Sequence, residues 1–479
     1  MIVGELRHGQ LTIIDRLREA VRLAEGLTDS GDLSAAARER ALDCLSRFGE
    51  RLRDMHASKV RAAGTSALRR AREDSGFMGH AETALGHPIE IISGIEEARL
   101  IYLGVVHSLP LNDGIRLVAD IGGGSTELIL GQGPKPRALE SLNIGCVGLT
   151  EQFFPGGVVT REGFDKARLA ARLELRPVKA FFRNAGELEA IGASGTMRAT
   201  ESVARELGLI EEQGLTLAAV EELIRRVLAF ETVAAIELKG LSERRAQVWP
   251  GGLAIVAELF VALRMPALKV SDGALREGLL YDLLGRLQHE DARKRTVRAM
   301  ASRYHVDRAQ AKRVATTARS LLDQCHAAWA FPMPFSAEML DWASRLHEIG
   351  LDISHSGFER HGAYIAENAD MPGFPRAEQR LLAFLIDSQR NSINVRRQRE
   401  LPRSWRTTAL RLSVLLRLAV LLNRSRSTVE LPPIRLTVGE DSVELAFDRD
   451  WLASNPLSVA DLERERGHLA AVGYRLEFG

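Results

Sequence analysis

The sequence predicts an α/β fold up to about Gly285, then an all-α domain, and then a small α/β domain at the C-terminus. Three observations predict this order. Short apolar runs alternate with amphipathic stretches up to about Gly285, helical periodicity then dominates from 291 to 391, and strand-like alternation returns near the end of the chain. Alternating strands and helices indicate an α/β domain, and consecutive amphipathic stretches indicate packed helices.

The first α/β unit is expected over residues 1–105. Apolar residues recur at helical spacing between Ser34 and Met55, so a helix is expected there. Strands are expected at 11–17, 60–63 and 89–92, and Ser93 begins the helix that follows the last of these.

The rest of the chain divides in the same way into three parts. A second α/β unit is expected over 106–288 and a helical domain over 289–395. The C-terminal domain, 396–479, opens with an arginine-rich segment that ends at Arg426. Alternation at 434–438 and 443–447 then predicts two strands. The arginines either guide an extended anion or lie on solvated helix faces, and the sequence favours neither.

Composition excludes several classes of protein. The 479 residues carry a net charge of +1, so no global charge indicates a nucleic-acid partner. The three cysteines, Cys44, Cys146 and Cys325, are far apart, which argues against a disulfide framework or a zinc ribbon. No apolar run reaches the ~18 residues of a membrane span. We expect a cytoplasmic protein that can also associate peripherally with a membrane.

The strongest local motif is the glycine-rich turn between two apolar strands, 117–130. One strand ends in Asp120, the turn holds Gly122, Gly123, Gly124, Ser125 and Thr126, and Glu127 begins the next strand. Three glycines let backbone amides converge on a phosphate, and the flanking carboxylates can hold Mg²⁺. The turn is neither a Walker loop nor a Rossmann turn. An ordinary glycine-rich hairpin is the alternative.

Two further loops follow strands and precede helices. Ser194, Gly195 and Thr196 open a helix after an apolar strand, and such a helix N-terminus suits an anion. Small residues are, however, common at strand-to-helix turns. The second loop, 270–274, is either a further anion-binding loop or a simple helix cap, with Ser271 or Asp272 as the capping residue. The sequence favours neither interpretation.

Two adjacent glutamates open the helix after Ser93. Ser93 and Glu96 have the spacing of a capping box, so Glu96 is expected to serve the helix terminus. Glu97 is then either a surface residue or, beside phosphate loops, a general base that activates water. Arg69 follows another strand end and either clamps a phosphate or is solvated.

Four motifs in this order closely resemble the exopolyphosphatase/guanosine pentaphosphate phosphohydrolase family. They lie at 93–99, 120–127, 192–196 and 271–278. The resemblance extends from Met1 to the C-terminus. It implies the fold of the actin/Hsp70/sugar-kinase superfamily, with two ribonuclease-H-like lobes. An all-α domain similar to the HD hydrolases and a small α/β domain would follow.

The resemblance also implies the roles of the motif residues. Glu97 matches the catalytic base, Asp120 and Glu127 match the acids beside a Mg²⁺ ion, and 122–126 and 194–196 match the phosphate loops. The expected activity is release of terminal orthophosphate from inorganic polyphosphate by a homodimer. Guanosine pentaphosphate is the alternative substrate, and a non-catalytic phosphate or nucleotide sensor is the alternative of another class. A kinase is disfavoured, since no acceptor-substrate site is evident.

The sequence departs from the family pattern at two places. The family opens with a strand ending in Asp-x-Gly-Ser-Asn, whereas Met1–Gly4 matches the strand after that loop. We therefore expect a start codon placed too far downstream, an incomplete first lobe, and poor folding or activity from Met1. In the helical domain, His347–Glu348 replaces His-Asp, and Gln389 stands where relatives can have histidine. No working metal site is expected there.

Overall fold

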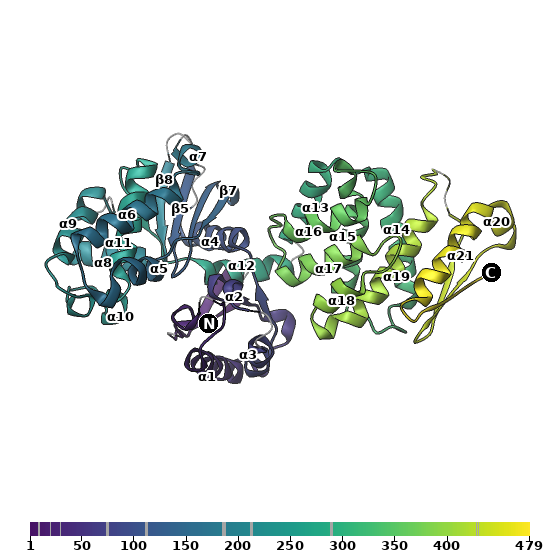
Figure 1. The fold of residues 1–479 in the computed structure, drawn as a ribbon, viewed down its shortest axis with the longest axis horizontal. Coiled ribbons are helices and arrows are strands. Elements are labelled where there is room, and N and C mark those ends of the chain that lie inside the picture. Colours follow the sequence, from purple (N-terminus) through teal and green to yellow (C-terminus); the bar gives the residue numbers. More distant parts are fainter. Residues whose placement is uncertain are drawn as a thin grey trace. The chain divides into compact units, whose positions relative to one another are not determined.

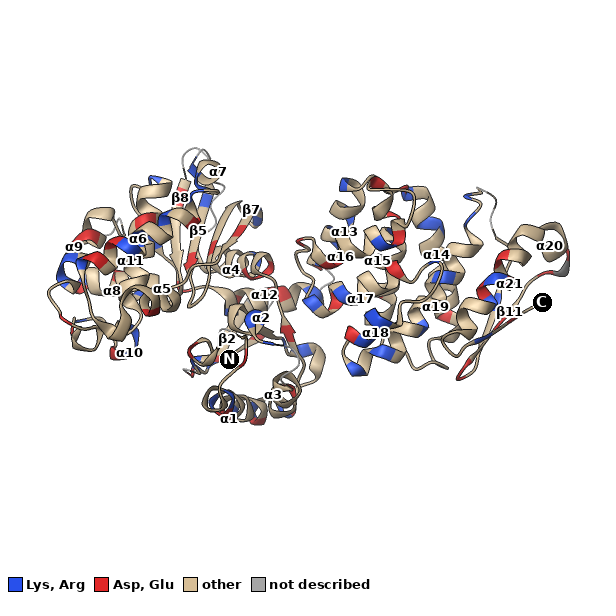
Figure 2. Ribbon diagram, viewed as in Figure 1, with Lys and Arg blue, Asp and Glu red and all other residues tan. Residues whose placement is uncertain are grey.

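A computed structural model of the chain forms two compact units, Met1–Glu290 and Asp291–Gly479, and each is considered by itself (Figure 1). The structure describes residues 1–7, 10–19, 21–28, 30–72, 76–110, 114–183, 188–210, 214–287, 291–427, 429 and 431–479. Basic and acidic residues are interspersed over the helices of both units (Figure 2), in keeping with the small net charge. Within the described ranges, no helix has the length and apolarity needed to cross a bilayer.

The first part of unit 1 holds two short sheets and three helices. Strand β1 pairs antiparallel with β2, and β3 pairs parallel with β4. The bounds are β1 Ile2–Arg7, β2 Gln10–Arg16, α1 Ala35–Leu52, β3 Ala62–Gly64, α2 Ser66–Arg70, α3 Phe77–Leu85 and β4 Ile89–Ile91. The helix and three strands predicted here are confirmed to within about three residues at their ends.

A five-stranded sheet is the centre of unit 1, in the order β7-β6-β5-β8-β9. Strands β5, β6 and β7 pair antiparallel, whereas β8 and β9 continue from β5 in parallel. The bounds are β5 Ile115–Ile121, β6 Thr126–Gln132, β7 Lys135–Leu142, β8 Leu188–Ala193 and β9 Lys269–Val270. The parallel pairing brings the C-terminal ends of β5 and β8 side by side.

Helices cover both faces of this sheet. Alternate β5 residues such as Leu117 pack with α5, α6, α9 and α11, whereas Val118 packs with α4 and α12. The bounds are α4 Gly94–Ser108, α5 Cys146–Phe153, α6 Arg161–Leu175, α7 Lys179–Arg183, α8 Ser194–Glu206, α9 Leu217–Val227, α10 Glu243–Ala246, α11 Trp249–Leu263 and α12 Leu275–Leu287. Helix α4 runs past the predicted boundary after residue 105, because its apolar face packs on the five-stranded sheet.

A buried ion cluster fixes α4 to α12 and to β3. The Arg99 guanidinium donates to both oxygens of Glu96, at 2.7 and 2.8 Å, and also pairs with Asp282 on α12. Arg61 donates to Asp282 at 2.6 Å. Ser93 caps α4 as predicted, accepting the Glu96 amide at 3.1 Å. The carboxylate of Glu96, however, lies in this ion cluster, so its expected role as a simple capping group is corrected.

Unit 2 combines helices with a three-stranded sheet around one continuous core. The helices are α13 Ala292–Arg303, α14 Arg308–Cys325, α15 Phe335–Leu346, α16 Phe358–Asn368, α17 Arg376–Asp387, α18 Val395–Glu400, α19 Arg406–Leu422, α20 Arg449–Ser454 and α21 Pro456–Ala470. The strands, in the order β10-β11-β12, are Arg435–Val438, Ser442–Ala446 and Arg475–Phe478. The helical character after residue 291 and the first two strands are confirmed. The likeness to HD hydrolases and the division of the chain into four domains stay predictions.

The arginine-rich segment of unit 2 is only partly a surface feature. Arg417 on α19 is 1% exposed and forms an ion pair with Glu465 of α21. Its guanidinium also donates to the carbonyls of Ser388 and Asn391. Arg417 therefore fits neither interpretation of this segment, because its charge is used inside the unit.

Candidate functional site

The two glycine-containing loops lie together at one edge of the five-stranded sheet. Asp120 on β5 is opposite Glu127 on β6 and beside Ala193 on β8. The loop 122–125 therefore adjoins the N-terminus of α8, which begins at Ser194. The sheet thus brings together the two loops that the sequence predicted as phosphate-binding.

Asp120 and Glu127 project from the same face of the sheet. Side chains alternate along a strand, so Asp120 shares a face with Val118, and Glu127 shares one with Ile129. Val118 and Ile129 both pack against α4. The two carboxylates therefore face the helix that begins with Glu97.

Backbone hydrogen bonds fix the conformation of the loop between Asp120 and Glu127. The Gly122 amide donates to Ser125 O at 2.9 Å, and the Val147 amide donates to Gly123 O at 2.9 Å. Within the described ranges, the amides of Gly123 and Gly124 donate to no protein acceptor. Successive amides of this kind form an anion-binding concavity.

The hydroxyls of the two loops bond to backbone carbonyls of the protein. Ser194 has φ of +81° and donates through Oγ to Ile121 O at 2.9 Å. The Thr196 hydroxyl lies 3.5 Å from the same carbonyl, and Thr126 donates to Ile144 O at 2.7 Å. Thr126 and Thr196 are fully buried. These bonds tie the loops together, so phosphate binding by these residues stays a prediction and would depend on their backbone amides.

Glu97 is held at the site by Arg69. Arg69 donates to Glu97 Oε2 at 2.8 Å and to Ile92 O at 3.0 Å, which fixes the carboxylate against the end of β4. Gly94 lets α4 approach β7, because a Cβ there would lie 2.4 Å from Ser141 Oγ. Ser141 in turn donates to Glu127 Oε1 at 2.9 Å. Glu97, Arg69 and the carboxylate pair therefore belong to one site, and the expectation of a solvated Arg69 is wrong.

The three carboxylates of the site repel one another. Burial, followed by the charge of Glu97, raises the pKa of Asp120 to about 7. Burial and the charges of Glu97 and Asp120 raise the pKa of Glu127 well above its usual range. Burial also raises the pKa of Glu97, although Arg69 opposes this shift. A cation bound here would relieve the repulsion.

The chemistry of these groups fits Mg²⁺. Mg²⁺ commonly binds through one or two carboxylates and completes its shell with water and substrate phosphate. Asp120 and Glu127 supply two oxygen donors beside the phosphate loop. Among the described residues, no three His, Cys, Asp or Glu side chains form a complete protein cage for a metal. Binding of Mg²⁺ by Asp120 and Glu127 stays a prediction.

A cluster of arginines near this site escaped the sequence analysis. Its members are Arg18, Arg198, Arg244, Arg245 and Arg276. Burial and then the charges of the other four lower the pKa of Arg18, and within the described ranges none of the five forms an ion pair. Arg245 lies over the start of α8, where a Cβ on Gly195 would be 2.1 Å from its Nη2. Arg276 lies within one of the recognised motifs, and Arg198 lies directly beside another. Their positions were the feature of the sequence that could have predicted part of this cluster.

Sequence comparison identifies the family to which this site belongs. The profile of the Ppx/GppA phosphatase family matches residues 2–287, and that of Ppx/GppA phosphatase domain III matches 292–466. The chain belongs to the Ppx/GppA phosphatase family. The predicted family and the prediction of a phosphoanhydride hydrolase are thereby confirmed.

Full-length relatives and solved structures agree with this assignment. The guanosine-5'-triphosphate,3'-diphosphate pyrophosphatase of Vibrio cholerae is 38% identical, over 99% of this chain and 95% of its own length. The protein of the same name from Photobacterium profundum is 36% identical, over 98% and 93%. A Ppx/GppA family member from Aquifex aeolicus matches with a TM-score of 0.50 at 26% identity, over 60% of this chain and 94% of its own. An exopolyphosphatase from Cytophaga hutchinsonii matches with a TM-score of 0.52 at 26% identity, over 59% and 93%.

Proposed function

We propose that the protein hydrolyses the terminal 5'-phosphate of guanosine pentaphosphate and releases orthophosphate. The similarity to proteins named for this substrate over nearly the whole chain supports the proposal most strongly. Polyphosphate was the first expectation from the sequence, and it becomes the second candidate. A cytoplasmic homodimer remains part of the proposal, and light scattering after size exclusion would test the dimer.

The chain's own residues account for the chemical step. The amides of Gly123 and Gly124 receive oxygens of the terminal phosphoryl group. The carboxylate of Glu97, held by Arg69, accepts a proton from the attacking water and directs it in line with the leaving oxygen. Mg²⁺ held by Asp120 and Glu127 would neutralise charge on the phosphoryl oxygens. Phosphoryl transfer needs mainly positioning and charge stabilisation, and these groups provide both.

The arginine cluster favours a substrate with more than one phosphate group. Arg245 lies beside the start of α8, and Arg18, Arg198 and Arg276 line the same cavity as Asp120 and Ser194. Guanosine pentaphosphate has a 3'-diphosphate in addition to its 5'-triphosphate. Guanidinium groups bind phosphate through paired charge-assisted hydrogen bonds, so the cluster suits this second group. It would also suit the continuing chain of polyphosphate, which keeps the second candidate open.

Phosphate release from the two substrates tests the proposal. The purified chain, with Mg²⁺, is given guanosine pentaphosphate or long-chain polyphosphate, and orthophosphate is measured. A higher kcat/KM for guanosine pentaphosphate is expected. A clear preference for polyphosphate would favour the second candidate, and release from neither substrate, with binding of both retained, would favour a sensor.

A further inference from the structure

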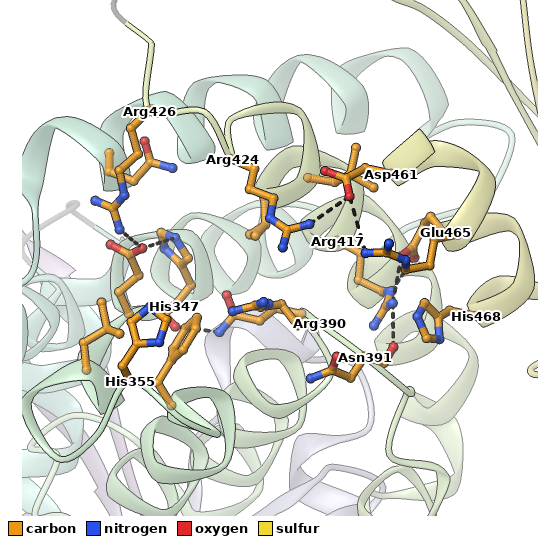
Figure 3. A pocket seen from close by; sticks show the side chains of 18 residues that line it. His347, His355, Arg390, Asn391, Arg417, Arg424, Arg426, Asp461, Glu465 and His468 are labelled. Atoms are coloured by element: carbon orange, nitrogen blue, oxygen red, sulfur yellow. Dashed lines mark hydrogen bonds and ion pairs between the residues drawn. The ribbon is translucent and has the colours of Figure 1, made fainter. Parts of the chain in front are cut away.

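A polar cavity lies wholly within unit 2. It has a volume of about 360 Å³ and opens between the segment around His347, the end of α17, helix α19 and helix α21 (Figure 3). This volume is within the usual range for small-molecule sites. None of the residues proposed for catalysis belongs to this unit, so the cavity needs its own explanation.

The cavity lining has an excess of positive charge. Five arginines line the cavity together with three carboxylates, and these residues are Arg390, Arg417, Arg424, Arg426, Arg464, Glu348, Asp461 and Glu465. Arg424 donates to Asp461 at 2.8 Å, and Arg464 lies 3.7 Å from the same carboxylate. Arg390 stacks over the ring of Phe358 at 5.3 Å and, within the described ranges, forms no ion pair. Arg390 therefore has no carboxylate partner among the described residues, and Arg464 has only the longer 3.7 Å contact with Asp461, so both guanidinium groups can still bind an anion.

Two side chains of the same lining, Glu348 and Gln389, carry buried acceptor atoms. Glu348 is 7% exposed and Gln389 is 3% exposed, and in the described part of the chain Glu348 Oε2 and Gln389 Oε1 have no hydrogen-bond partner. The orientation of the Gln389 amide is settled, because Nε2 donates to His347 O at 2.5 Å and to Ile386 O at 3.0 Å. A buried acceptor without a donor is costly, so a ligand that supplies donors to these two atoms would be stabilised here.

His347 adds a third acceptor beside these two. Its Nδ1 donates to Ser344 O at 2.7 Å, and burial lowers the pKa of the ring to about 4. The neutral ring therefore has its lone pair at Nε2, 3.8 Å from Glu348 Oε1. Arg426 pairs with that same Glu348 oxygen. The positive surroundings disfavour a metal ion at these acceptors.

We propose that this cavity is a guanine-nucleotide site, with Glu348 and Gln389 accepting from the base and Arg390 and Arg464 binding the phosphates. The Watson–Crick edge of guanine carries two adjacent donors, N1–H and the 2-amino group. Adenine places an acceptor, N1, beside its amino group, which would face the unpartnered oxygens. Sites built for a particular hydrogen-bond pattern reject ligands that leave buried polar groups unpaired. The site lies in unit 2 and does not depend on the substrate proposed for unit 1.

Photocrosslinking to the full chain tests the site directly. The probe is 8-azido-GDP, and peptide mass spectrometry identifies the labelled segment, which separates this cavity from any binding in unit 1. Label is expected near 347–358 or 389–391, with protection by GDP and little protection by ADP. Label confined to unit 1, or equal protection by the two nucleotides, would overturn the proposal.

Matched variants test the two halves of the cavity. Arg390→Ala and Arg464→Ala should each weaken GDP protection of the unit 2 label about 10-fold or more, since each removes a charge-assisted bond to phosphate. Arg396→Ala, at a side chain 92% exposed, removes the same charge outside the cavity and should leave protection unchanged. Glu348→Gln should reduce the difference between GDP and ADP in protecting the unit 2 label. Thermal unfolding checks that this variant is folded. An Arg390→Ala protein that behaves like Arg396→Ala would overturn the assignment.

Discussion

Replacing Glu97 with glutamine separates its proposed chemistry from any contribution to stability. The amide keeps the size of the side chain and an oxygen that can accept from Arg69, but it cannot take a proton from water. General-base catalysis contributes roughly 10²–10⁴-fold, so kcat should fall by that factor while KM changes little. Because burial disfavours the ionised form of Glu97, the neutral variant should fold at nearly the wild-type temperature.

The neighbouring residue is a control supplied by the same turn of helix. Glu96 is fully buried and accepts two bonds from Arg99, with Arg61 3.6 Å away. Removing one partner from a buried ion cluster costs about 3–5 kcal/mol. At roughly 2–4 °C per kcal/mol, Glu96→Gln should therefore lower Tm by about 6–20 °C. Its kcat, measured well below that Tm, should remain near wild type.

Phosphate release and thermal unfolding, measured on both variants, decide between these roles. If Glu97→Gln retains kcat within about threefold of wild type, Glu97 is not the general base. If Glu96→Gln loses activity at an unchanged Tm, the roles of the two residues have been reversed.

Five further outcomes are expected. Asp120→Ala and Glu127→Ala should each raise the Mg²⁺ concentration for half-maximal activity, and full wild-type activity in excess chelator would contradict the metal role. The raised pKa of Asp120 means that the folded state holds its proton more tightly than the unfolded chain, so metal-free stability should fall as pH rises from about 4 to about 7. Added Mg²⁺ should raise Tm more at pH 8 than at pH 5. Arg245→Ala should raise KM about 10-fold or more, with a smaller effect on kcat, if its guanidinium binds substrate phosphate. Arg417→Met should lower the free energy of unfolding by about 3–5 kcal/mol, because it leaves Glu465 buried without its partner. Replacing both Arg417 and Glu465 with apolar residues should restore most of that free energy, and unfolding in denaturant would measure both effects.

Local patterns in the sequence were enough to predict the motifs, the helix near 35–52, several strands and the helical character of 291–391. The glycine-rich turn, the strand before Ser194 and the cap at Ser93 all depend on neighbours within a few residues. The four motifs together also identified the family, which the profile matches confirm. The strand 475–478 was missed, because its four residues pair only with a distant strand, β11.

Long-range pairing decided what the sequence left open. Glu96 and Glu97 are indistinguishable in the sequence, because both are glutamates in the first turn of one helix. In the structure, Glu96 belongs to an ion cluster with Asp282, which lies 186 positions later, whereas Glu97 is bound by Arg69. The arginine cluster near α8 also draws its members from segments far apart in the chain. Local propensity depends on nearby residues, whereas the burial and the ion partner of a charged side chain depend on which segments the sheet and helices bring together. The sequence therefore determined which chemical groups the site contains, and the tertiary structure decided which of them face one another.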